Sequence, residues 1–192
     1  MQKTKAIVMD EASVERALTR MAYEILERNK GTDHLVLIGI KRRGTPLARI
    51  LADNLLKIEG VRVPVEEIDI TPYRDDQVPT PGGRQPCISL QCTAITGMHC
   101  VLVDDVLYTG RTVRSAMDAL IAKGRPQSIR LAVLIDRGHR ELPIHADFIG
   151  KHVPTSHTEA IGVRVPEYDA CLDVILYETD LGKLTIANPV IL

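Results

Sequence analysis

One short string of residues constrains the fold of this chain more than any other. From Val101 to Val113 an apolar run leads into two adjacent aspartates, and a turn of small residues then opens a helical pattern. The apolar run predicts a buried strand, and a strand that feeds a helix through a tight turn is typical of a parallel α/β sheet. The string therefore predicts a strand–turn–helix unit with polar groups at its junction.

The rest of the chain alternates the same two kinds of segment. Apolar residues at helical spacing predict a helix over Glu11–Asn29, which Gly31 ends, and a second helix from Thr45. Short apolar runs predict strands at residues 35–40, 61–70, 101–103, 129–135 and 171–177. Together they indicate an α/β protein with a mostly parallel, twisted sheet flanked by helices. Such sheets carry their sites at the carboxyl ends of strands, here residues 39–44, 104–112 and 136–140.

Composition excludes several classes of protein. The chain has no apolar run as long as a membrane span and no signal-peptide pattern at its start, so we expect a cytoplasmic protein without membrane contact. One Phe and no Trp argue against an aromatic platform for nucleic-acid bases. The net charge of −1 means that any nucleic-acid site is a local basic patch. The four cysteines lack CxxC spacing and are interpreted as reduced thiols.

The junction after the strand has the chemistry of a sugar-phosphate site. Exposed amides at the start of a helix attract a phosphate, and the hydroxyls of Thr109 and Thr112 add hydrogen bonds. The carboxylates of Asp104 and Asp105 suit ribose hydroxyls or a hard cation. The alternative is that the two acids only end a strand, but the whole string of 13 residues favours the sugar-phosphate interpretation.

A second glycine-bounded loop, residues 39–44, follows the strand at residues 35–40. Its glycines have the spacing of a Walker A loop, but Thr45 and Pro46 stand where a Lys-Ser/Thr pair is needed, which argues against a nucleoside triphosphatase. Its three consecutive cations favour a pyrophosphate loop over a solvated basic turn. Residues 71–86, rich in Pro and Gly, predict a flexible lid.

The string at residues 101–113 resembles the phosphoribosyl-pyrophosphate (PRPP) motif of type I phosphoribosyltransferases. Further strings resemble, within that fold, the family of bifunctional pyrimidine-operon attenuation regulators. They are ALTR at 17–20, ERNKG at 27–31, DIT at 69–71, YRDD at 73–76, GRP at 124–126, DRGHRELP at 136–143 and VPTS at 153–156. The resemblance covers about residues 6 to 178. It implies a type I phosphoribosyltransferase fold with a small hood built from both chain ends, a single domain at 1–180 and a C-terminal extension at 181–192.

The resemblance also implies an enzyme, a uracil phosphoribosyltransferase that converts uracil and PRPP to UMP and pyrophosphate with Mg²⁺. Asp104, Asp105 and Arg137 are the implied catalytic residues, and the two acids meet the metal indirectly, through PRPP. The phosphate and ribose of PRPP and UMP are assigned to Asp104, Asp105, Val106, Leu107, Tyr108, Thr109, Gly110, Arg111 and Thr112. Pyrophosphate is assigned to Lys41, Arg42, Arg43, Gly44 and Arg74, and uracil to backbone groups near Ile161.

The second implied activity is UMP-dependent binding of a leader hairpin in pyrimidine-operon mRNA by a homodimer or higher homo-oligomer. The RNA contacts are assigned to Arg16, Thr19, Arg20, Arg28, His139, Arg140 and Lys151. Tyr23, His145 and Arg42 depart from the family pattern, where His, Arg and Thr are usual. Two alternatives stay open: a salvage enzyme without RNA binding, and a catalytically weak RNA-binding nucleotide sensor.

Overall fold

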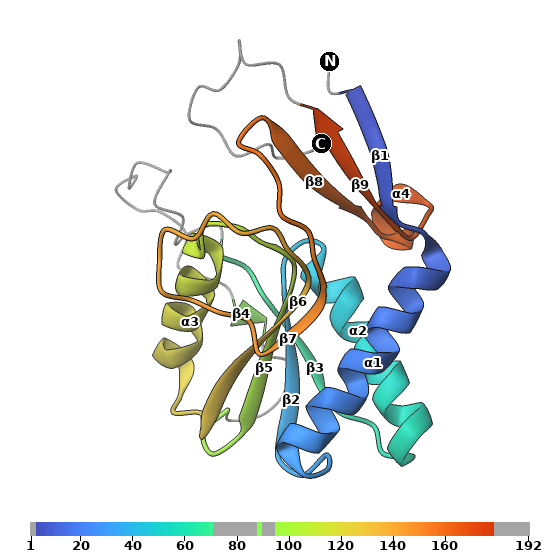
Figure 1. Ribbon diagram of the computed structural model, residues 1–192. Helices are drawn as coiled ribbons and strands as arrows, with labels where there is room; N and C mark the ends of the chain where they lie inside the picture. The colour runs from blue at the N-terminus through green and yellow to red at the C-terminus, as the bar shows by residue number, and fades with distance from the viewer. Residues whose placement is uncertain (1–2, 71–87, 90–94, 179–192) are drawn as a thin grey trace.

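A computed structural model describes residues 3–70, 88–89 and 95–178 of the chain. Its centre is a six-stranded sheet in the order β4-β3-β2-β5-β6-β7 (Figure 1). The five strands β3, β2, β5, β6 and β7 run parallel to one another, whereas β4 runs antiparallel to β3. The strands are β2 (Leu35–Ile40), β3 (Val65–Ile68), β4 (Ile88–Ser89), β5 (His99–Leu107), β6 (Ser128–Asp136) and β7 (Phe148–His152).

Helices cover both faces of this sheet (Figure 1). The helices α1 (Glu11–Asn29) and α2 (Gly44–Glu59) pack on one face, and α3 (Arg111–Lys123) packs on the other. Successive residues of a strand point to opposite faces, so Leu35 and Leu37 join the core under α1 and α2 while Val36 and Ile38 join the core under α3. Burial on both faces explains why the central strands are unbroken apolar runs.

A second, three-stranded sheet forms the hood that the sequence predicts. It consists of β1 (Lys3–Met9), β8 (Glu159–Arg164) and β9 (Asp173–Glu178), antiparallel in the order β1-β9-β8, with the short helix α4 (Pro166–Asp169) between β8 and β9. Figure 1 shows this sheet beyond the carboxyl ends of the central strands. The loops that follow β2, β5 and β6 therefore lie between the two sheets.

Several boundaries differ from the sequence prediction. The helix α1 has the predicted bounds, but Lys30 adopts the left-handed conformation that ends it, and Gly31 donates its N–H to Leu26. The strand predicted at 61–70 is only β3, because pairing with β2 begins after Pro64, which lacks an N–H, and stops where β2 ends. The strand predicted at 101–103 extends to Leu107, because β6 continues beside it.

Some predictions fall on other parts of the chain. The lid at residues 71–86, with Arg74, and the extension at 181–192 lie outside the described residues. The single-domain boundary at residue 180 stays a prediction. Among the helices of the described residues, none combines the length and the hydrophobicity that crossing a membrane requires.

Candidate active site

Two adjacent carboxylates, of buried Asp104 and half-buried Asp105, form the floor of the candidate site. Asp104 and Asp105 lie within β5 and not beyond its end, as the sequence had suggested, because the ladder with β6 continues past them. Asp104 is only 7% exposed and accepts a hydrogen bond from the amide of Asp105 at 2.9 Å. Asp105 accepts one from the amide of Val106 at 2.8 Å. These local bonds fix both side chains at the start of the loop that follows.

Burial governs the protonation of this pair. It raises the pKa of Asp104 well above the usual range of a carboxyl group, and the neighbouring charge of Asp105 raises that pKa further. Burial also raises the pKa of Asp105, although the charge of Arg43 works in the opposite direction. Removing these two adjacent acids from water costs free energy, and a hydroxyl donor or a cation beside them would lower that cost.

A turn at residues 108–112, which we call the phosphate-binding turn after the role that the sequence resemblance implies, joins β5 to α3. Gly110 has a φ of 93° at the N-cap of α3, a left-handed conformation that favours glycine. Among the described residues, the amide N–H groups of Tyr108, Thr109, Gly110 and Thr112 find no hydrogen-bond acceptor. Free amides at the start of a helix of 13 residues form a site for an anion.

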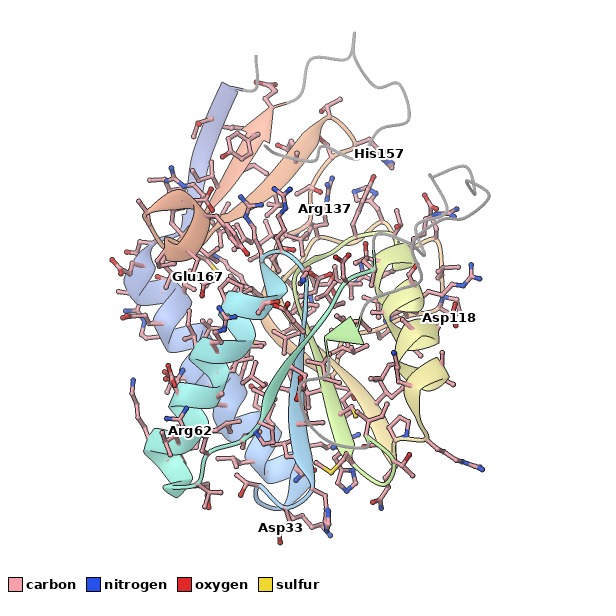
Figure 2. All side chains as sticks on the ribbon, turned by 180° about the vertical axis from the view of Figure 1, so that it is seen from behind. Asp33, Arg62, Asp118, Arg137, His157 and Glu167 are labelled. Carbon is pink, nitrogen blue, oxygen red and sulfur yellow. The ribbon has the colours of Figure 1, made fainter. Side chains whose placement is uncertain are left out.

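A cluster of side chains closes one side of the turn. The guanidinium of Arg137 lies 4.0 Å from the centre of the Tyr108 ring, and the His139 ring meets that ring edge-on at 5.9 Å. His157 packs on His139 with ring centres 4.3 Å apart. Figure 2 shows Arg137 and His157 on the side of the central sheet that faces the hood. No pattern in the sequence indicated that Tyr108 stacks with Arg137 or that His157 packs on His139, because these contacts join segments that are separated in the chain.

Arg137 also reaches the hood directly. Its side chain donates to the hydroxyl of Thr155 at 3.0 Å and to the carbonyl of Glu159 in β8 at 2.8 Å. Carbonyls of alternate strand residues point to the same side, so the backbone of Ile161 faces the side of β8 on which Arg137 lies. β8 is an edge strand of the hood, and this side of it is not paired with β9. Arg137 and the outward-facing backbone of Ile161 thus lie on the same side of β8.

The loop before α2 brings its cations to the same end of the sheet. Lys41 pairs with Glu67 at 2.9 Å, Arg43 pairs with Asp169 of the hood at 3.1 Å, and Arg42 is exposed. The peptide bond between Lys41 and Arg42 is cis. A Cβ on Gly44 would lie 2.2 Å from the carbonyl oxygen of Val103. Gly44 therefore allows the loop to pack on β5, directly before the two acids.

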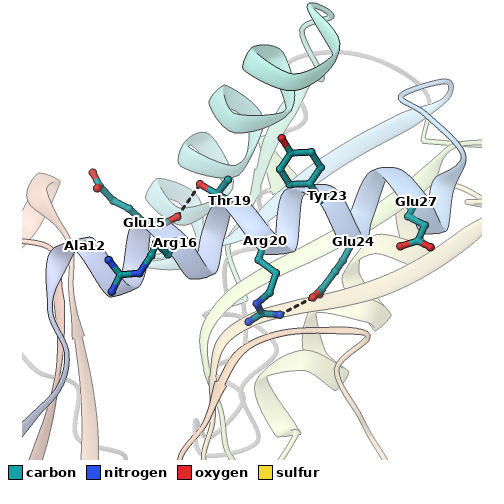
Figure 3. A pocket seen from close by; sticks show the side chains of 8 residues that line it. All are labelled: Ala12, Glu15, Arg16, Thr19, Arg20, Tyr23, Glu24 and Glu27. Atoms are coloured by element: carbon teal, nitrogen blue, oxygen red, sulfur yellow. Dashed lines mark hydrogen bonds and ion pairs between the residues drawn. The ribbon is translucent and has the colours of Figure 1, made fainter.

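The residues assigned to RNA fall into two groups. Arg16, Thr19 and Arg20 line an open groove of about 640 Å³ along α1, with Tyr23, which is 56% exposed (Figure 3). Arg20 bonds Glu24 at 2.6 Å and the carbonyl of Gly150 at 2.7 Å, which joins the groove to β7. The groove is lined by Ala12, Glu15, Arg16, Thr19, Arg20, Tyr23, Glu24 and Glu27. Arg28 and Lys151 are exposed as well, and Lys151 donates to the carbonyl of Val8 at 3.0 Å.

His139 and Arg140 form the other group, and both face the phosphate-binding turn. The ring of His139 bonds the carbonyl of Thr155 at 2.6 Å, and the side chain of Arg140 is only 17% exposed. Arg140 binds backbone carbonyls of residues 107 and 108 and the carboxylate of Asp136. The structure therefore places these two residues beside the turn and leaves little of Arg140 accessible to an RNA phosphate.

The side chains of the site also indicate what kind of metal ion could bind there. Within the described residues, no three His, Cys, Asp or Glu side chains gather closely enough to hold a metal ion. The carboxylate oxygens of Asp104 and Asp105 are of the type that Mg²⁺ prefers, so the two acids fit an ion that takes its ligands mainly from a phosphate-bearing substrate and water.

Comparisons with known proteins agree with this geometry. A model of the phosphoribosyl transferase domain matches residues 7–165. Proteins named bifunctional protein PyrR match 92% of the chain: that of Listeria monocytogenes is 55% identical over 97% of its own length, and that of Clostridium kluyveri is 50% identical over 99%. A hypoxanthine phosphoribosyltransferase of Trypanosoma cruzi has a similar fold, with a TM-score of 0.71 at 20% identity, covering 92% of this chain and 98% of its own.

Proposed function

Since this chain belongs to the phosphoribosyltransferase family, and within it to the bifunctional PyrR proteins, we propose a site for each of its two activities. The protein is a regulator of pyrimidine-operon attenuation with uracil phosphoribosyltransferase activity. PRPP and UMP bind in the space between the phosphate-binding turn and the hood. The observation that carries this assignment is the row of turn amides that lack an acceptor among the described residues, next to the carboxylates of buried Asp104 and half-buried Asp105.

The ribose 5-phosphate end of PRPP occupies the phosphate-binding turn. Its oxygens accept from the free amides, and the positive end of α3 stabilises their charge. The ribose hydroxyls donate to Asp104 and Asp105, which restores the hydrogen bonds that burial denies these carboxylates. The acids then lie below the sugar, where their charge stabilises the cationic character that develops at the anomeric carbon.

The leaving pyrophosphate lies at the loop before α2. Lys41 pairs with Glu67, Arg43 pairs with Asp169, and Arg42 is exposed, so the loop can direct cations to pyrophosphate. Mg²⁺, when bound with PRPP, neutralises charge on the leaving group. Asp104 and Asp105 would hold that ion indirectly, through PRPP, and the ion would supply positive charge next to the leaving group.

Uracil lies under the hood, against the outward-facing backbone of Ile161. An unpaired strand edge offers both an N–H and a C=O, which match the acceptor and donor groups along the edge of a uracil ring. Arg137 joins this edge to the turn through Glu159 and Tyr108, so it holds the base end and the phosphate end of the site at a fixed separation.

The leader RNA hairpin binds along α1 and β7, and the protein meets it in the cytoplasm. Arg16, Arg20 and Lys151 supply the charge, and the exposed ring of Tyr23 supplies a surface on which an unstacked base can lie. Glu15, Glu24 and Glu27 line the same groove, so the affinity depends on a few well-placed contacts and not on a strongly basic field.

The deciding experiment measures binding of a pyrimidine-leader hairpin by the purified protein, with and without UMP, across a salt series. We expect binding that UMP strengthens and that salt weakens steeply. The same preparation is assayed for release of pyrophosphate from PRPP and uracil. Turnover without UMP-dependent RNA binding would leave a salvage enzyme, and RNA binding without turnover would leave a nucleotide sensor.

A further inference from the structure

The guanidinium of Arg140 is bonded entirely within the protein. Its Nε donates to the carbonyl of Ile144 at 3.0 Å, and its Nη1 donates to the carbonyls of Leu107 at 3.2 Å and Tyr108 at 2.7 Å. Nη1 also lies 3.1 Å from the carbonyl of Gly138, and Nη2 binds the carboxylate of Asp136. All three nitrogens of the side chain have acceptors, so it is fixed in one orientation.

The backbone of the loop that carries Arg140 also donates hydrogen bonds to carbonyls at the start of the turn. The amides of Glu141 and Leu142 donate to the carbonyl of Thr109 at 3.0 and 3.2 Å. The amide of Arg137 donates to the carbonyl of Leu107 at 3.2 Å. The three consecutive carbonyls from residue 107 to residue 109 therefore all accept hydrogen bonds from residues 137–142.

Fixing a carbonyl also fixes an amide. In a trans peptide the C=O of one residue and the N–H of the next point in opposite directions. Because the carbonyls of residues 107, 108 and 109 face the loop, the N–H groups of Tyr108, Thr109 and Gly110 face away from it. These are three of the amides that lack an acceptor among the described residues. The loop thus sets the direction of the donors that face the ligand.

We propose that Arg140 is a positioning residue of the phosphate-binding turn and that it acts on UMP and PRPP through the carbonyls of residues 107 and 108, not as a contact to RNA. The inference rests on the proposed function, because it takes the turn to be the phosphate site. A guanidinium is needed for this role, since the single ammonium of a lysine cannot bond four carbonyls and a carboxylate at once.

The test compares UMP with uridine, which lacks the phosphate, by calorimetric titration of the full chain without RNA. In the wild type we expect UMP to bind more tightly than uridine. Arg140→Gln should weaken UMP binding at least about tenfold and uridine binding far less, because the turn loses the bonds that orient its amides. Arg140→Lys keeps the charge and should lose a similar part of the preference for UMP.

The controls separate the possible failures. Arg62→Gln removes the same charge from an exposed arginine that Figure 2 places at the end of the molecule away from Arg137, and it should leave both affinities unchanged. If Arg140→Gln and Arg140→Lys both keep the ratio of UMP affinity to uridine affinity that the wild type has, the inference is wrong. Arg140 would then again be assigned to the RNA surface. A wild type that does not prefer UMP would overturn the assignment of the turn itself. If Arg140→Gln does not fold, the ratio in Arg140→Lys decides.

Discussion

The phosphate-binding turn and the groove along α1 present donors in opposite ways. In the turn the donors are backbone amides, and three carbonyls behind them are held by residues 137–142. In the groove the donors are long exposed side chains: Arg16 bonds a residue of its own helix, and Arg20 bonds both its own helix and the carbonyl of Gly150 in β7. The difference teaches that a row of donors can be fixed by the backbone itself, whereas the donors of the groove are side chains whose directions depend on the partners of each one.

The largest expected effect is at the floor of the active site. Asp105→Asn removes a charge placed to stabilise the cationic sugar, so kcat/KM for PRPP should fall about 10²–10³-fold. Steady-state release of pyrophosphate measures this. RNA affinity without UMP should stay at the wild-type value, because the groove along α1 does not include Asp105. A fall in both activities would show that the two regions are not separable.

The next effect concerns the packing that supports the turn. Gly44→Ala places a methyl group 2.2 Å from the carbonyl oxygen of Val103, so α2 must move away from β5. We expect a loss of about 3 kcal/mol in the free energy of unfolding, measured by urea denaturation. Gly60→Ala is the matched control, because a Cβ at that position would meet no atom within 4 Å and its strain comes only from a φ of 71°. Equal losses in the two variants would contradict the packing argument.

A smaller effect follows from the raised pKa of Asp104. The folded protein holds this proton more tightly than the unfolded chain does, so stability falls as the pH rises from the ordinary carboxyl range through the raised pKa. Asp104→Asn cannot ionise and should melt at a higher temperature than the wild type at pH 8, with a smaller difference at pH 4. Melting curves without ligand measure this, and a difference that does not change with pH would contradict the account.

The smallest effect is expected in the groove. Arg20→Gln should weaken hairpin binding several-fold and lower the slope of log affinity against log salt by about 1, because one phosphate contact is lost. Turnover of PRPP and uracil should not change. Arg62→Gln, at an exposed arginine that does not line the groove, serves as the control for a lost surface charge. An unchanged salt slope in Arg20→Gln would remove Arg20 from the RNA surface.

Much of the fold could be predicted from local pattern. The helix over Glu11–Asn29, the parallel sheet and the turn before α3 follow from apolar spacing and from glycines and threonines at a helix start, which are properties of neighbouring residues. The exact ends of strands could not be predicted, because β5 continues through Asp104 and Asp105 only where β6 lies beside it. Pairing across the sheet, and not local preference, decides where such a strand stops.

The sequence by itself determined which residue types stand together at this site, since the two aspartates and the Thr-Gly-Arg-Thr turn lie close together in one short stretch of the chain. Only the tertiary structure decided the directions of the side chains that come from elsewhere. Arg140 lies 32 residues from Tyr108 in the chain and Arg43 lies 126 from Asp169, and both pairs are joined by hydrogen bonds. A motif shows which groups are present, but a long side chain points toward the acceptors that the fold supplies.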